Sequence, residues 1–202
     1  AMKYMLMRLS SNFGNMFSMN GAALLLPFLP MPASQILLNN FIYDVAQLSL
    51  PSDNVDAEYL AKPKQWNLKF MTRYMLVFGP ISSLFDFFTF WILYNSMHLT
   101  GGAFQAGWFL ESLATQVLVI YVIRTRKIPF LQSRPSSLLA LTTVCAVFFA
   151  LILVTTKLGQ VFGFAALSFG TIGLIATLVV SYLIIVEAAK QIFYRKFHQP
   201  DA

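Results

Sequence analysis

The sequence is poor in charge and in cysteine. Of its 202 residues, 11% are charged and 57% are hydrophobic, whereas a soluble domain usually carries about 25% charged residues. This shortage of charge argues against a soluble globular protein. A single cysteine, Cys145, excludes a disulfide within the chain and any CxxC metal pair. Because Cys145 stands in an apolar run, we expect it to be a small core residue.

Common catalytic and nucleotide-binding motifs are also missing. The sequence contains no phosphate-binding glycine loop, no HExxH motif and no nucleophile elbow. The net charge of +6 does not indicate a nucleic-acid partner, because the basic residues form short clusters between apolar runs. We therefore predict no catalytic residue within this chain and no binding of nucleic acid.

Long apolar segments dominate instead. A helix needs roughly 20 residues to cross a bilayer, and six segments are candidates: residues 4–27, 33–50, 70–97, 104–123, 136–156 and 163–188. The expected fold class is all-α, a polytopic membrane protein with a bundle of six transmembrane helices. Prolines 27, 30 and 32 separate the first two segments, which predicts a tight hairpin whose helices pack together.

The six segments divide the chain into three helical hairpins, two loops and a tail. The predicted hairpins are 1–50, 70–123 and 136–190; the loops are 51–69 and 124–135, and the tail is 191–202. With six spans, every lysine and arginine except Lys157 falls on one side, which the positive-inside rule makes cytoplasmic. Both termini and both loops are then cytoplasmic.

Basic residues next to the spans are candidates for contact with anionic lipid headgroups. This prediction applies to Arg124, Arg126, Lys127, Arg195 and Lys196. A different role is expected for Lys190, because it lies three residues after Glu187 and this spacing favours a salt bridge on a helix.

Ionisable groups at membrane depth are costly and often functional. Three acidic residues qualify: Asp44, Asp86 and Glu111. Asp44 lies four residues after Asn40, so that both side chains share one face of a helix. For Asp86, helix packing is the alternative to a place in an ion pathway.

The first segment offers matching polar groups. Asn12 and Asn15 share a face, and Asn15 is twelve residues from the proline hairpin, as is Asp44 on the other side. Amide oxygens and one carboxylate are ligands that suit Mg²⁺, which keeps several waters and uses only one or two carboxylates. The alternative is that these groups only hydrogen-bond the helices together.

Several stretches resemble P-type cation-transporting ATPases, in particular the magnesium-importing branch. Residues 10–15 and 38–44 resemble membrane helices five and six of that family, and residues 43–51 resemble the magnesium branch. Further similar stretches, in the family's order, are 79–86, 107–111 and 123–130. The resemblance implies ATP-driven import of Mg²⁺ across a bacterial inner membrane.

The same resemblance implies a set of ion ligands. These are Asn12, Asn15, Asn40 and Asp44, with Glu111 matching a glutamate of helix eight. Arg8 departs from the pattern, because the magnesium branch carries a small or polar residue there, and an arginine one turn before Asn12 could perturb cation entry.

The family's cytoplasmic motifs DKTGT, TGES and GDGxND do not occur in this chain. The resemblance thus predicts a transport module that uses ATP only through domains outside this sequence, with the remainder of the pump as its partner. The alternatives are a truncated, non-catalytic membrane scaffold or regulatory fragment, another P-type divalent-cation pump, or an unrelated six-helix channel.

Overall fold

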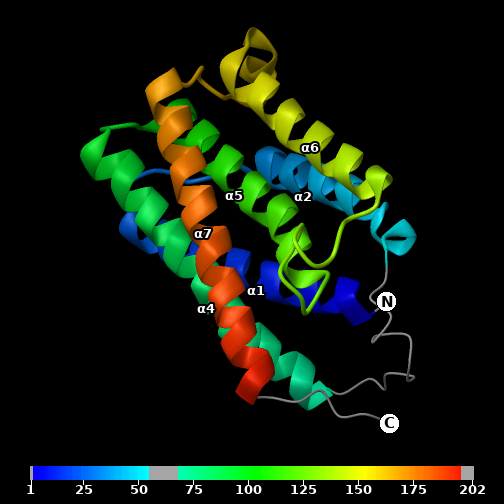
Figure 1. The fold of residues 1–202 in the computed structure, drawn as a ribbon. Coiled ribbons are helices and arrows are strands. Elements are labelled where there is room, and N and C mark those ends of the chain that lie inside the picture. The colour runs from blue at the N-terminus through cyan, green and yellow to red at the C-terminus, as the bar shows by residue number, and fades with distance from the viewer. Residues whose placement is uncertain (1, 55–67, 197–202) are drawn as a thin grey trace.

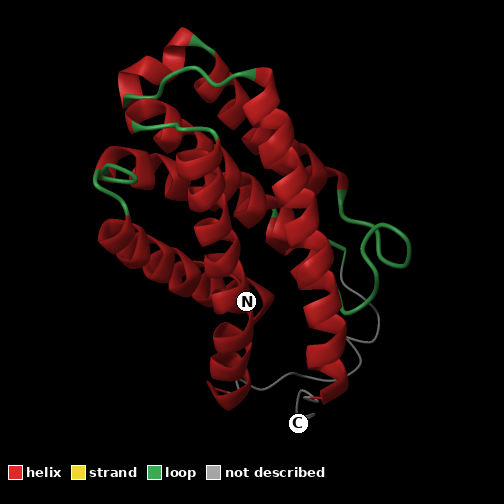
Figure 2. Cartoon of the chain, turned by 90° about the vertical axis from the view of Figure 1, so that its left-hand side faces the viewer, coloured by secondary structure: helices red, strands yellow, loops and turns green. Residues whose placement is uncertain are grey.

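The described chain is almost entirely helical (Figure 1). The computed structural model describes residues 2–54 and 68–196, so most of the predicted loop 51–69 and the last residues of the tail lie outside the described part. The long helices are α1 (Met2–Leu25), α2 (Ala33–Gln47), α4 (Leu68–Trp91), α5 (Gly101–Ile123), α6 (Ser137–Thr155) and α7 (Phe169–Lys196). Three short helices join them: η1 (Leu50–Ser52), η2 (Ile92–Ser96) and η3 (Lys157–Phe162). Loops are confined to the connections between helix ends (Figure 2).

The predicted all-α membrane fold is confirmed. Within the described residues, four helical segments are long and apolar enough to cross a membrane: α4 together with η2, α5, α6 and α7. Helices α1 and α2 form close to the predicted positions but do not meet this standard, since α1 carries several polar side chains and α2 has only 15 residues. A count of six membrane spans therefore stays a prediction.

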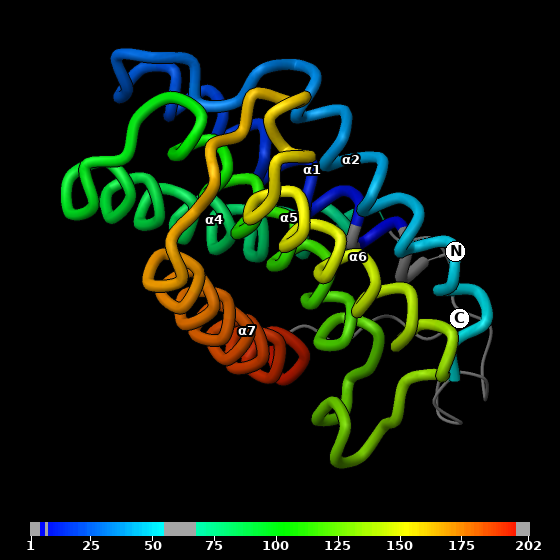
Figure 3. The backbone as a smooth tube through the Cα atoms, turned by 90° about the horizontal axis from the view of Figure 1, so that it is seen from above, coloured from blue at the N-terminus to red at the C-terminus, as the bar shows by residue number. Residues whose placement is uncertain are grey.

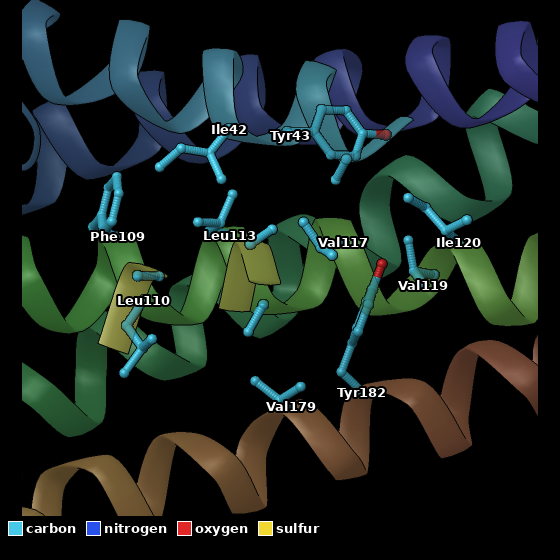
Figure 4. Packing of buried hydrophobic residues seen from close by; sticks show 14 of the residues in the cluster. Ile42, Tyr43, Phe109, Leu110, Leu113, Val117, Val119, Ile120, Val179 and Tyr182 are labelled. Atoms are coloured by element: carbon cyan, nitrogen blue, oxygen red, sulfur yellow. The ribbon is translucent and has the colours of Figure 1, made fainter. Parts of the chain in front are cut away.

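Helix α5 is the centre of the bundle. It packs against all five of the other long helices, and Figure 3 shows it enclosed between them. Ile42 and Tyr43 of α2 lie on one side of α5, while Val179 and Tyr182 of α7 lie on the opposite side (Figure 4). In the apolar stretch of α5, 94% is buried inside the structure, whereas only 33–39% is buried in the corresponding stretches of the other three apolar segments. The polar side chains in the middle of α5 are therefore buried: Glu111, Ser112, Thr115 and Gln116.

The outer faces of α4, α6 and α7 are apolar and exposed. Leu84, Phe148 and Ile184 are each more than 60% exposed, as expected for surfaces that face lipid. Cys145 lies on the same outward surface of α6. The expectation of a core position for Cys145 is wrong, because the inward face of α6 is set by Thr143, Ala146 and neighbours one turn away.

The hairpin of α1 and α2 does not pack as predicted. Helix α1 lies mainly against α4, and α2 lies against α5 and α6. Small residues explain the choice of α4: the Ser83 hydroxyl donates to the Gly14 carbonyl at 3.0 Å, and Gly79 leaves room for the Phe13 ring. Such close approach of two backbones favours helix association in membranes. The two helices of the hairpin consequently diverge, and a cavity lies between them.

Candidate cation site

A cavity of about 260 Å³ lies between α1, α2 and α5. Its polar lining consists of four carboxamides and a hydroxyl: Asn12, Asn15, Asn39, Asn40 and Ser112. Three methionines, Ile36 and Trp108 provide the rest of the wall. The cavity has room for several waters, so a partly hydrated cation would fit inside it.

A hydrogen-bonded network connects the three helices along this cavity. The Gln116 amide of α5 donates to Ser112 Oγ at 2.7 Å and to Asn15 Oδ1 of α1 at 3.2 Å. The Asn39 amide of α2 donates to the same Ser112 oxygen at 3.3 Å. Asn39 Oδ1 and Gln116 Oε1 are buried, and neither has a hydrogen-bond partner among the described residues. Asn39 lines the cavity, so a cation or its water there can complete the bonding of its oxygen, whereas Gln116 lies outside the lining and acts through Asn15 and Ser112.

The predicted ligands are only partly brought together. Asn12, Asn15 and Asn40 line the cavity, whereas Asp44 and Glu111 do not belong to its lining. Asp44 lies one turn beyond Asn40 and forms an ion pair with Arg8 of α1. The second guanidinium nitrogen, Nη2, donates to Asp44 Oδ2 at 3.2 Å.

Glu111 and Asp86 of α4 are both buried, and neither belongs to the cavity lining. Asp86 accepts a hydrogen bond from Ser18 Oγ at 2.5 Å and another from Trp108 Nε1 at 3.0 Å. These contacts join α1, α4 and α5, so Asp86 acts as a helix-packing group in this structure. Glu111 Oε2 is buried and has no hydrogen-bond partner among the described residues.

Basic residues predicted at the lipid headgroups occupy different environments. Arg124 is 1% exposed and binds Asp53, so its guanidinium is not available to lipid. For Arg124 the predicted headgroup contact is wrong, because the loop around Asp53 folds over it. Arg126 lies over the Tyr194 ring at 4.8 Å, and Arg195 is exposed.

The predicted salt bridge between Lys190 and Glu187 is confirmed at 2.7 Å. Lys190 also makes hydrogen bonds that its spacing from Glu187 did not predict. Its Nζ also donates to the carbonyls of Val122 and Lys127, both at 3.0 Å. A fully buried ammonium thereby satisfies carbonyls at and beyond the end of α5.

Sequence reasoning missed Asn39, Ser112 and Gln116 as site residues. One signal in the sequence could have indicated them, because all three are polar residues within apolar segments, and polar residues at membrane depth are often functional. However, Asn39 is adjacent to Asn40 and a helix places adjacent side chains about 100° apart, so their joint contact with one cavity could not be expected from spacing. Within the described residues, no group of three or more His, Cys, Asp or Glu side chains could hold a metal ion.

Comparison with known proteins agrees with this architecture. Residues 28–192 match the family model described as "Cation transporting ATPase, C-terminus". The chain is 39% identical over 201 residues to "Magnesium-transporting ATPase, P-type 1" of Salmonella typhimurium, a match that covers 98% of the chain and 22% of the relative. The protein of the same name from Escherichia coli K12 is 38% identical over 200 residues, again with 22% of its length covered. The chain thus spans about a fifth of the length of these relatives.

The helical bundle, its apolar outer faces and its polar interior cavity define a polytopic membrane protein. The chain belongs to the cation-transporting ATPase C-terminus family, and it corresponds to the C-terminal membrane region of the magnesium-transporting P-type ATPases.

Proposed function

We propose that this chain is the part of an ATP-driven magnesium pump that holds Mg²⁺ during its import across a bacterial inner membrane. The observation that carries the proposal is the carboxamide-lined cavity between α1, α2 and α5. The relatives' names support Mg²⁺ as the transported ion.

Mg²⁺ binds in this proposal with much of its water shell. Asn12, Asn15 and Asn40 offer carbonyl oxygens toward the cavity, and Asp44 one turn away supplies the negative charge. Mg²⁺ dehydrates reluctantly and takes one or two carboxylates with several waters. One carboxylate beside a ring of amides matches that preference better than a cage of carboxylates would.

Transport then requires the cavity to open to each side in turn. ATP would supply the energy for this opening through domains outside this sequence, because no nucleotide-binding motif occurs in the 202 residues. Helix α1 lies against α4 over much of its length, so a movement of one helix would change the separation of α1 from α2. Asn15 and Asn40 would separate in that movement, and the carboxamide oxygens would no longer converge on the ion.

The test is Mg²⁺ uptake by a full-length pump that carries these helices. Asp44→Asn removes the charge and keeps the size of the side chain, and we expect it to abolish uptake. Asp56→Asn, in the predicted loop 51–69, is a control that removes a carboxylate outside the membrane segments. Undiminished uptake by Asp44→Asn would refute the proposed site. Loss of pump from the membrane in both variants would instead indicate a structural effect, so the amount of inserted protein is measured in parallel.

A further inference from the structure

Arg8 and Asp44 form a two-point ion pair between helices that otherwise diverge. One guanidinium nitrogen donates to Asp44 Oδ2 at 3.2 Å, and the other is paired with Oδ1. The planar fork of arginine suits a carboxylate in this way and gives both charge and orientation. The carboxylate that the proposed Mg²⁺ site depends on is therefore already engaged by a cation of the chain itself.

The ion pair lies at one end of the cavity. Arg8 is four residues before Asn12, and Asp44 is four residues after Asn40; both asparagines line the cavity. Four residues of helix place the paired side chains roughly 6 Å beyond the asparagines, on the same helix faces. Arg8 and Asp44 are therefore both nearer than the asparagines to the side of the membrane that the distribution of lysine and arginine predicts to be cytoplasmic.

The strength of this pair suits a reversible contact. The side chains of Arg8 and Asp44 are 30% and 44% exposed, and partly exposed ion pairs contribute little net stability. In contrast, an unpaired carboxylate at membrane depth is costly. Arg8 thus neutralises Asp44 without holding it so firmly that a divalent cation could not replace it.

We propose that Arg8 is a tethered counter-cation that competes with the transported divalent cation for Asp44. When Mg²⁺ binds, the guanidinium leaves the carboxylate; when Arg8 returns, it helps to expel the ion toward the cytoplasmic end. This inference rests on the proposed function, because it concerns the same site. It adds a specificity and release role for a residue that no comparison assigns.

Competition has a measurable consequence. If Arg8 occupies Asp44 for nine-tenths of the time, the apparent affinity for Mg²⁺ falls about ten-fold, because only the remaining tenth of molecules is competent to bind. Removing the guanidinium should therefore tighten apparent Mg²⁺ affinity about ten-fold. The same change should lower the maximal uptake rate, since the group that displaces the ion is lost.

The first experiment measures uptake against Mg²⁺ concentration in a full-length pump that carries these helices. Arg8→Gln should lower the KM for Mg²⁺ about ten-fold and reduce the maximal rate. Arg8→Lys keeps the charge but loses the two-point geometry, so its values should fall between those of the parent and Arg8→Gln. Arg195→Gln, an exposed arginine on α7, is the matched control and should change neither value. A merely structural role for Arg8 would not tighten apparent Mg²⁺ affinity while it slows uptake.

A second experiment needs no variant. Phenylglyoxal modification of Arg8, followed by mass spectrometry, should increase when saturating Mg²⁺ displaces the guanidinium from Asp44, with Arg195 as the internal reference. Unchanged labelling of Arg8, or a KM that is unchanged or raised in Arg8→Gln, would overturn the tethered-cation role while leaving an Asp44-dependent Mg²⁺ site intact. Uptake that does not depend on Asp44 would overturn both proposals together.

Discussion

The guanidinium of Arg124, the residue that follows α5, lies 2.5 Å from the Asp53 carboxylate. Both side chains are more than 90% buried, although the two residues are 71 positions apart in the chain. Arg124 also donates to the carbonyls of Asn54, Ser133 and Arg134. The other Asp53 oxygen accepts from the backbone N–H of Ser136, at the start of α6. One arginine therefore joins the end of the η1 segment to the connection between α5 and α6.

Breaking this pair should be strongly destabilising. Arg124→Ala leaves a buried carboxylate and several carbonyls without donors, so we expect a loss of about 3–5 kcal/mol in the free energy of unfolding. Unfolding in mixed detergent and SDS measures this loss. Arg126→Ala, two residues along and exposed, should cost less than about 1 kcal/mol. Similar losses for the two variants would show that the Arg124 contacts are not formed in the protein.

A second prediction concerns the close contact of α1 with α4. A methyl group added at Gly79 would lie 2.6 Å from a ring carbon of Phe13, so Gly79→Ala should cost about 1–3 kcal/mol through overpacking. The double variant with Phe13→Leu should recover part of that loss, which a double-mutant cycle quantifies.

Gly173 in α7 is the matched control for Gly79, because a methyl group there would meet no atom within 4 Å. Gly173→Ala should be neutral or stabilising by up to about 1 kcal/mol, since alanine favours a helix. If both alanine variants behave alike, α1 does not approach α4 as closely as described.

A third prediction concerns Asp86, which accepts hydrogen bonds from Ser18 of α1 and Trp108 of α5. Trp108→Phe removes the indole donor and keeps an aromatic ring, and Ser18→Ala removes the hydroxyl donor. Each change leaves a buried acceptor with one donor fewer, so each should cost about 1–3 kcal/mol in the free energy of unfolding. Thermal unfolding in detergent measures both losses. Unchanged stability in both variants would contradict the hydrogen-bonded arrangement.

A fourth prediction tests Gln116 as the residue that positions Asn15. Gln116→Leu removes both of its donated hydrogen bonds while keeping similar volume, and one hydrogen bond is worth about 1 kcal/mol, so apparent Mg²⁺ affinity should fall about 5-fold. Gln160→Leu, in the exposed part of η3, should have no effect. The KM of Mg²⁺ uptake by the full-length pump measures both, and an unchanged KM in Gln116→Leu would remove Gln116 from the site.

Much of the fold could be predicted from residue order alone. Apolar runs of membrane length and prolines between them placed every long helix to within a few residues, except the first residues and the end of α7. The start differs because the chain leaves η3 through Gly163 in a left-handed conformation, with φ of 81°, and α7 begins only at Phe169. Helix α7 also continues to Lys196, past the predicted end at residue 188. Asn12 and Asn15, related by the i, i+3 spacing, both line one cavity with Asn40, whereas Asp44, at i, i+4 from Asn40, lies outside its lining.

The sequence by itself thus determined a helical membrane protein, its family and the polar positions at membrane depth, because hydropathy and helical periodicity are local properties. Only the tertiary structure decided that α1 packs on α4 rather than on α2, that Asp44 pairs with Arg8, and that Asp86 accepts from Ser18 and Trp108. Each of these contacts joins residues that are distant in the chain. Each therefore depends on which helix faces pack closely against one another. Spacing along one helix carries no information about the helix that will lie beside it.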